Sequence, residues 1–217
     1  MAGKPGDPAK KSLSHRYVIA LALVAVVVSL SAFTAMAVKD QTYVGSPGFK
    51  ATADVPHEYV VVYYSRSGHS EAVAHEVATR LNTPIARINA NYPLSFQGQR
   101  KAIADAEAEA FPEIEVEAVD IQSAKRIYLV SPTWMFRPAP PLWTFVRDRD
   151  LSGKEVVLIM TGNSRFKSEE IDKFSQLIES RGGHLLYQEF IRRGRFFWQM
   201  SRAELLDSVQ NLLEKKY

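Results

Sequence analysis

Residues 59–81 read "YVVVYYSRSGHSEAVAHEVATRL". The apolar run at 59–64 is typical of a buried strand, and the apolar residues that follow at every fourth position predict a helix over 69–81. Three hydroxyl side chains and a glycine lie at this junction: Ser65, Ser67, Ser70 and Gly68. Such a turn suits either a simple helix cap or a phosphate pocket, because a helix N-terminus offers free N–H groups and the positive end of its dipole to an anion.

Strand and helix patterns alternate after this stretch. Further strands are predicted near residues 85–89, 126–131, 155–160 and 184–191, and further helices near 99–110, 142–147, 168–180 and from Ser201 onward. Five strands separated by helices predict an α/β fold, with a doubly wound five-stranded parallel sheet covered by helices on both faces. Ligands of such folds bind at the carboxyl ends of the strands. We therefore expect the chemistry in the loops after Tyr64, Val130 and Met160.

The composition narrows the function classes. The chain has 217 residues, a formal net charge of +3 and no cysteine. The absence of cysteine excludes disulfides, cysteine-based metal sites and cysteine nucleophiles. The Lys and Arg residues are spread along the chain, so no nucleic-acid partner is expected. The first loop has no lysine after Gly68, no G-x-G-x-x-G pattern and no acidic cluster, so we expect neither a P-loop nor a metal site there.

The charge and hydropathy pattern of residues 1–38 predicts a membrane segment. Residues 1–16 form a basic tail, residues 17–38 carry no charge, residues 39–56 are rich in small residues and proline, and residues 57–217 form the α/β domain. As a helix, residues 17–38 would extend about 33 Å, enough to cross a hydrocarbon core of about 30 Å. We interpret them as a single-pass transmembrane helix or signal-anchor, and residues 39–56 as a linker.

Two other interpretations of residues 17–38 stay open. The triplet Ala35-Met36-Ala37 matches a signal-peptidase site, so the segment could be a cleaved signal peptide. It could also be a buried core helix. For a membrane anchor, the basic tail favours a cytoplasmic N-terminus and a domain on the non-cytoplasmic side of the membrane.

The second and third loops add aromatic and small polar residues to the same predicted edge of the sheet. The second reads "SPTWMFRPAPP" from Ser131 and contains Trp134 and Phe136, and the third reads "TGNSRF" from Thr161 to Phe166. A phosphate pocket flanked by aromatic side chains suits a phosphorylated planar heterocycle.

Three segments then resemble a known family. "VVYYSRSGHSEAVAHEVA" is similar to the phosphate loop of flavodoxins, T/S-x-T/S-G-x-T/S, between the first strand and helix. "YLVSPTWMFRPAPPLWTFV" and "DLSGKEVVLIMTG" resemble the third- and fourth-strand segments of the same family. The similarity covers about residues 58–216 and corresponds to the short-chain, FMN-binding type. It implies a sheet of strand order 2-1-3-4-5.

The resemblance also implies which residues bind the cofactor, FMN. The phosphate-binding residues would be Ser65, Arg66, Ser67, Gly68, His69 and Ser70. The residues around the isoalloxazine would be Pro132, Thr133, Trp134, Met135, Phe136, Thr161, Gly162, Asn163 and Phe166. Trp134 would pack against the ring, and Phe166 could be a second stacking aromatic. Met135 and Phe136 depart from the family pattern, which often has Trp-Gly at these positions.

The leading hypothesis is a membrane-anchored, flavodoxin-like protein that binds FMN and transfers electrons to a redox partner protein or a small-molecule acceptor. The cofactor would carry the redox chemistry, so no catalytic side chain is predicted. One alternative is an FMN-dependent NAD(P)H oxidoreductase acting on quinones or similar acceptors. Another is a flavin-free flavodoxin fold that serves as a binding module.

Overall fold

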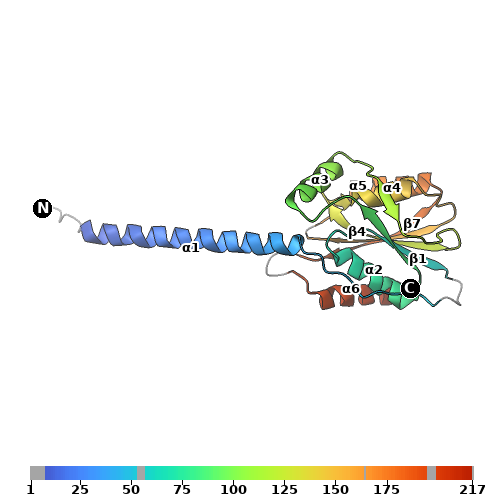
Figure 1. Cartoon of the computed structure of the whole chain (residues 1–217), viewed down its shortest axis with the longest axis horizontal. Helices are drawn as coiled ribbons and strands as arrows, with labels where there is room; N and C mark the ends of the chain where they lie inside the picture. The colour runs from blue at the N-terminus through green and yellow to red at the C-terminus, as the bar shows by residue number, and fades with distance from the viewer. Residues whose placement is uncertain (1–7, 53–56, 164, 195–198, 217) are drawn as a thin grey trace. The chain divides into compact units, whose positions relative to one another are not determined.

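The apolar run and the four-residue pattern form β1 (Tyr59–Tyr63) and α2 (His69–Leu81) in the computed structural model, and the helix has its predicted bounds. The structure describes residues 8–52, 57–163, 165–194 and 199–216. The chain forms two compact units, Met1–Asp40 and Gln41–Tyr217. The described strands all belong to the second unit (Figure 1).

The other elements follow in the predicted alternation. The remaining strands are β2 (Ile85–Ala90), β3 (Ile114–Val116), β4 (Arg126–Trp134), β5 (Arg137–Pro138), β6 (Glu155–Gly162) and β7 (His184–Arg192). The remaining helices are α1 (Pro8–Asp40), α3 (Phe96–Glu107), α4 (Pro140–Arg147), α5 (Ser168–Ser180) and α6 (Arg202–Lys216). Ser95 caps α3 by accepting a hydrogen bond from the Gly98 N–H, which explains why that helix begins three residues before its predicted start.

The sheet is parallel over its five central strands, in the order β2-β1-β4-β6-β7. This is the predicted order 2-1-3-4-5, so the fold class is confirmed. The predicted number of five strands is wrong, because the sheet has seven within the described part of the chain. β3 extends the edge antiparallel to β2, and β5 folds back antiparallel on the end of β4. Both additions are only two or three residues long, too short to give a periodic signal.

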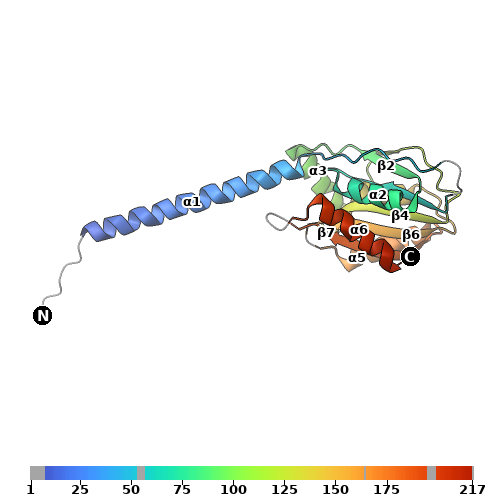
Figure 2. The same cartoon turned by 90° about the horizontal axis from the view of Figure 1, so that it is seen from below.

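Two apolar layers cover the sheet, one on each face. Along β1 the side chains alternate: Val60 and Val62 belong to one layer, and Val61 and Tyr63 to the other. Helices α3, α4 and α5 cover the first face, and α2 and α6 cover the second (Figures 1 and 2). Near-continuous burial of β1, β4 and β6 is what a parallel sheet with helices on both faces requires.

Helix α1 contains the predicted membrane segment. A span of 24 residues, His15–Val38, has a mean hydropathy of 2.6, and none of its most apolar 18-residue window is buried inside the structure. By length and composition alone it could cross a membrane. A signal sequence near the N-terminus has the same properties.

The segment before β1 lies against the domain. The N–H of Val44 donates to the carbonyl of Ser67, and the amide N–H of Thr52 donates to Oδ1 of Asn82, at the other end of α2. Phe49 packs against the apolar layer beneath α2 and α6. Residues 43–52, part of the predicted linker, therefore run along α2 and belong to the same compact unit as the sheet.

The core of the first layer gives a test of the packing. Phe174 on α5 is fully buried and contacts the ring of Trp143 edge-on, with 4.9 Å between ring centroids. We expect Phe174→Ala to lower the free energy of unfolding by about 3–5 kcal/mol, because it leaves a cavity in a close-packed core. The measurement is denaturant unfolding followed by circular dichroism. Phe96→Ala is the control, since Phe96 is 65% exposed, and equal losses in the two variants would contradict the layer assignment.

Candidate functional site

The three predicted loops meet because their strands are neighbours. β1 pairs with β4, and β4 pairs with β6, so the carboxyl ends of all three lie at one edge of the sheet. The N–H of Tyr64 donates to the carbonyl of Val130 at 2.9 Å, and Pro132 lies opposite Thr161 in the ladder. The sheet thus brings the predicted phosphate loop next to the other two loops.

The first loop is built around Gly68, which has φ of +91°, in the left-handed region that favours glycine. Its N–H donates to Oγ of Ser65 at 3.0 Å, and α2 begins at the next residue without a side-chain cap. The first N–H groups of an α-helix have no acceptor within the helix. The loop therefore ends in an uncapped helix N-terminus, the arrangement that binds anions.

Buried hydroxyls surround this N-terminus. Ser65, Ser70 and Thr161 are all buried, and Oγ of Ser70 lies 2.8 Å from Oγ1 of Thr161, on β6. This hydrogen bond joins the first loop to the third. Gly162 allows a similar close approach, because a Cβ there would lie 2.2 Å from Oγ1 of Thr133. The structure thus brings together five of the predicted residues: Ser65, Ser70, Thr133, Thr161 and Gly162.

The second loop is a tight β-hairpin. β4 and β5 pair Trp134 with Arg137, so Met135 and Phe136 alone make the turn, with φ of +48° and +71°. Positive φ at both positions is the requirement of a type I′ turn, which usually takes Asn or Gly. Arg137 is buried next to Glu170 and Trp143, which fixes the return strand. Met135 and Phe136, where the sequence departs from the flavodoxin pattern it resembles, therefore form the tip of this hairpin.

Two of the predicted aromatic residues, Trp134 and Phe166, lie in separate aromatic groups. Trp134 contacts Tyr64 and Tyr92 edge-on, with centroid distances of 5.5 and 4.9 Å. Phe166 instead packs against Phe190 of β7, at 5.5 Å, and joins the core. Tyr92, on the loop after β2, was not among the predicted residues, because no pattern marks it as part of this site.

The hairpin tip also contacts the third loop. The carbonyl of Phe136 accepts a hydrogen bond from the N–H of Lys167, and the guanidinium of Arg165 lies 5.3 Å from the centroid of the Phe136 ring. Met135 is 39% exposed at the same tip. Arg66, also predicted as a phosphate-binding residue, donates to the carbonyls of Pro93 and Ser95, with its shortest bond 2.7 Å.

Arg193 is a further residue of the site that the motifs did not single out. It follows β7 and is buried, its N–H donates to the carbonyl of Gly162, and its Nη2 donates to Oδ1 of Asn163 at 3.0 Å. Its charge lies close enough to His69 to act on that imidazole.

The pKa of His69 is lowered to about 4. Burial is the largest cause, since it disfavours the charged imidazolium, and the positive charges of Arg193 and Arg202 lower the pKa further. His69 is therefore neutral at pH 7. The positive potential at this edge comes from the arginines and the helix N-terminus.

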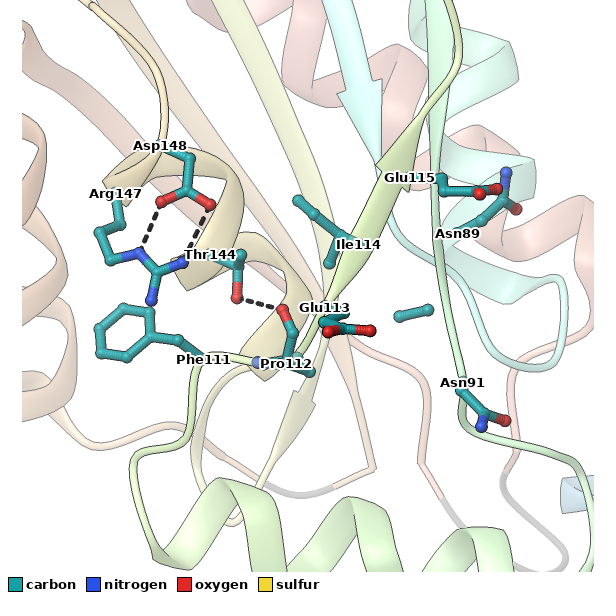
Figure 3. Close-up of a pocket in the computed structure, with 11 residues that line it drawn as sticks. Asn89, Asn91, Phe111, Pro112, Glu113, Ile114, Glu115, Thr144, Arg147 and Asp148 are labelled. Carbon is teal, nitrogen blue, oxygen red and sulfur yellow. Dashed lines mark hydrogen bonds and ion pairs between the residues drawn. The ribbon is translucent and has the colours of Figure 1, made fainter.

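A separate groove of about 650 Å³ lies between the loop before β3 and the end of α4 (Figure 3). Several polar groups that line it bind one another. Arg147 forms two hydrogen bonds with Asp148, at 2.6 and 2.9 Å, and Thr144 donates to the carbonyl of Pro112. The Arg147 guanidinium also lies over the Phe111 ring. None of the predicted site residues lines this groove. Within the described residues, no group of three or more His, Asp or Glu side chains could hold a metal ion.

No protein-family model matches the chain, and no curated protein matches it in sequence. Solved structures do match. A flavoprotein in complex with FMN from Lactobacillus acidophilus NCFM is 18% identical, with a TM-score of 0.53 over 62% of this chain and 93% of that one. A proposed flavoprotein from Bacteroides uniformis is 16% identical, with a TM-score of 0.55 over 72% and 99% of the two chains. These likenesses confirm the predicted flavodoxin-like fold.

The electrostatics of the first loop give a second test. We expect His69 to titrate in an NMR experiment with a pKa of about 4, and Arg193→Gln to raise that pKa by removing a nearby positive charge. Arg165→Gln is the control, since Arg165 is not among the charges that act on His69.

The lowered pKa of His69 also determines how its protonation changes the stability of the fold with pH. Because the folded state disfavours the protonated imidazole, the contribution of His69 to stability is complete above about pH 6.5 and is lost as the pH falls toward about 4. A His69 that titrates near 6.5 in the folded protein would contradict this placement.

Proposed function

We propose that the chain binds FMN non-covalently at the three loops and transfers electrons through it. The observation that carries this proposal is the hydroxyl-lined, uncapped N-terminus of α2 at Gly68, near the buried guanidinium of Arg193. Hydroxyls, a helix dipole and a cation together suit a phosphate monoester. The L. acidophilus flavoprotein, solved in complex with FMN, has the same fold and supports FMN as the phosphorylated heterocycle.

In this proposal the phosphate is held by the first loop, with Ser65, Ser67 and the N–H groups that begin α2. Arg193 adds a positive charge, and Asn163, hydrogen-bonded to it, holds the guanidinium in place. Trp134 and the hairpin tip at Met135 and Phe136 would lie along the ring, together with the third loop. Phe166, which packs on Phe190, would support that loop from the core.

The cofactor would supply reversible one- and two-electron chemistry when bound. The chain's own residues would bind and orient it: the sheet edge fixes the three loops, and the aromatic group of Tyr64, Tyr92 and Trp134 gives an apolar wall. No side chain of the loops needs to act as an acid, base or nucleophile. The electron acceptor in this proposal is a redox partner protein or a small molecule.

We also propose that residues 17–38 anchor the protein as a single membrane span, with the domain on the non-cytoplasmic side. The helical span His15–Val38 would be about 36 Å long, against a hydrocarbon core of about 30 Å. The lysines and arginine of the basic tail favour its retention in the cytoplasm: Lys4, Lys10, Lys11 and Arg16.

The FMN proposal is tested by comparing FMN with riboflavin, which lacks the phosphate. We expect the purified full chain in detergent to bind FMN roughly 100-fold or more tightly than riboflavin, because several charge-assisted hydrogen bonds go to the phosphate. Ser67→Glu places a negative charge in the loop and should abolish that difference while leaving riboflavin binding nearly unchanged. Flavin fluorescence titrations measure both affinities.

The matched control is Ser175→Glu, which adds the same charge at a partly exposed position of α5, away from the three loops. It should keep the preference for FMN. A wild-type chain that is purified without flavin bands and shows no binding in the titration would overturn the proposal.

The membrane proposal is tested by fractionation and mass spectrometry. We expect the full chain to stay in the membrane pellet after alkaline carbonate extraction, because about 22 uncharged residues are inserted in the bilayer. Deletion of residues 1–38 should move it to the supernatant. A mature protein whose mass corresponds to loss of residues 1–37, ending at the Ala35-Met36-Ala37 triplet, would instead establish a cleaved signal peptide.

A further inference from the structure

The segment before β1, residues 43–52, which we call the strap, lies directly on the phosphate loop. The N–H of Val44 donates to the carbonyl of Ser67 at 3.2 Å. A Cβ on Gly68 would lie only 1.9 Å from the carbonyl oxygen of Val44. Any other residue at position 68 would therefore collide with the strap, besides being strained by its positive φ.

This contact fixes the peptide in the middle of the loop. The carbonyl of the Ser67–Gly68 peptide accepts from Val44, and the N–H of the same peptide donates to Oγ of Ser65. Both polar groups of the peptide are thus held, one by the strap and one by the loop itself. The orientation of this peptide sets where α2 begins, at the N–H groups proposed to receive the phosphate.

The strap also engages the acidic residue nearest the loop. Glu71 lies in the first turn of α2 and is buried. One of its carboxylate oxygens accepts from the N–H of Ser46 at 2.8 Å, and the other accepts from the hydroxyl of Tyr43. Arg87 of β2 pairs with the same carboxylate at 3.5 Å and donates to the Tyr43 hydroxyl at 2.9 Å. A buried carboxylate this close to an anion site would repel the anion unless its charge were compensated.

A basic residue of α6 also holds the strap. Nη2 of Arg202, on α6, donates to Oγ of Ser46 at 2.6 Å. The charge of Arg202 also acts on His69, the first residue of α2. The strap therefore connects Glu71, the acidic residue next to the loop, to Arg202, one of the two cations that act on His69.

We propose that Tyr43, Val44 and Ser46 are positioning residues of the phosphate site, so that the affinity for the FMN phosphate depends on the docked strap. The inference rests on the proposed FMN function. It adds that the segment between the apolar helix and the domain controls the site: undocking of the strap releases the Ser67–Gly68 peptide and the Glu71 carboxylate, and the phosphate binds more weakly.

The test uses the full chain in detergent and two variants of the strap. Val44→Pro removes the N–H that donates to Ser67, and Tyr43→Phe is a milder change that removes only the hydroxyl, which is bound to Glu71 and Arg87. Each should weaken FMN roughly tenfold, the effect expected from loss of one hydrogen bond to a positioned group, and should change riboflavin affinity much less. Thr52→Val is the matched control, because it removes a strap hydrogen bond at the far end of α2.

Hydrogen exchange provides a readout that needs no ligand. In D₂O, mass spectrometry of peptides covering residues 65–70 should show faster exchange in Val44→Pro and Tyr43→Phe than in the wild type or Thr52→Val. Unchanged loop exchange, together with an unchanged ratio of FMN to riboflavin affinity, would overturn the inference while leaving the FMN proposal intact. If the wild type binds no FMN, the FMN proposal fails, and the exchange of the loop alone decides whether the strap positions it.

Discussion

Three parallel strands, β1, β4 and β6, are hydrogen-bonded side by side, with Val62 opposite Leu129 and Leu129 opposite Leu158. Because side chains alternate along a strand, a slip of one residue in this register would exchange the two buried faces of the sheet. The same register places the three loops at one edge. The bond between Ser70 and Thr161, and the close approach of Gly162 to Thr133, exist only because these strand ends are level with one another.

The electrostatic character of the site follows from what is buried there. Burying the guanidinium of Arg193 is costly, and its hydrogen bond to Asn163 offsets part of that cost. His69 lies nearby but is kept neutral, so it adds no charge at pH 7. The arginines keep their positive charge throughout the neutral pH range.

Much of the fold could be predicted from the sequence because its signals are local. Helices α2 and α5 have strong periodicity and begin and end at their predicted residues. The hairpin of β4 and β5 could not be predicted, since its turn uses Met135 and Phe136 where a type I′ turn normally has Asn or Gly. Two residues in this strained region cost roughly 1–2 kcal/mol each, so the surrounding packing determines the turn.

The site was predictable only in part for a similar reason. The hydroxyl loop is a contiguous motif, and so it was visible in the sequence. Arg193, Tyr92 and the strap act through contacts between residues far apart in the chain, such as Arg202 with Ser46, 156 positions away. A segment of small residues and proline without periodicity has the composition of a flexible linker, and nothing in that composition shows that it is docked.

The docked strap bears on how the chain tolerates changes in length. Insertions and deletions between a membrane segment and a domain are usually harmless, since a flexible linker only has to be long enough to connect the two. Here the strap is fixed at Val44 and again at Thr52, at opposite ends of α2, so the number of residues between these points is set by the length of the helix. A single-residue insertion within it would shift either Glu71 or Asn82 away from its partner. The functional boundary of the domain therefore lies before Tyr43, and a fragment that begins at β1 would be a chemically different domain.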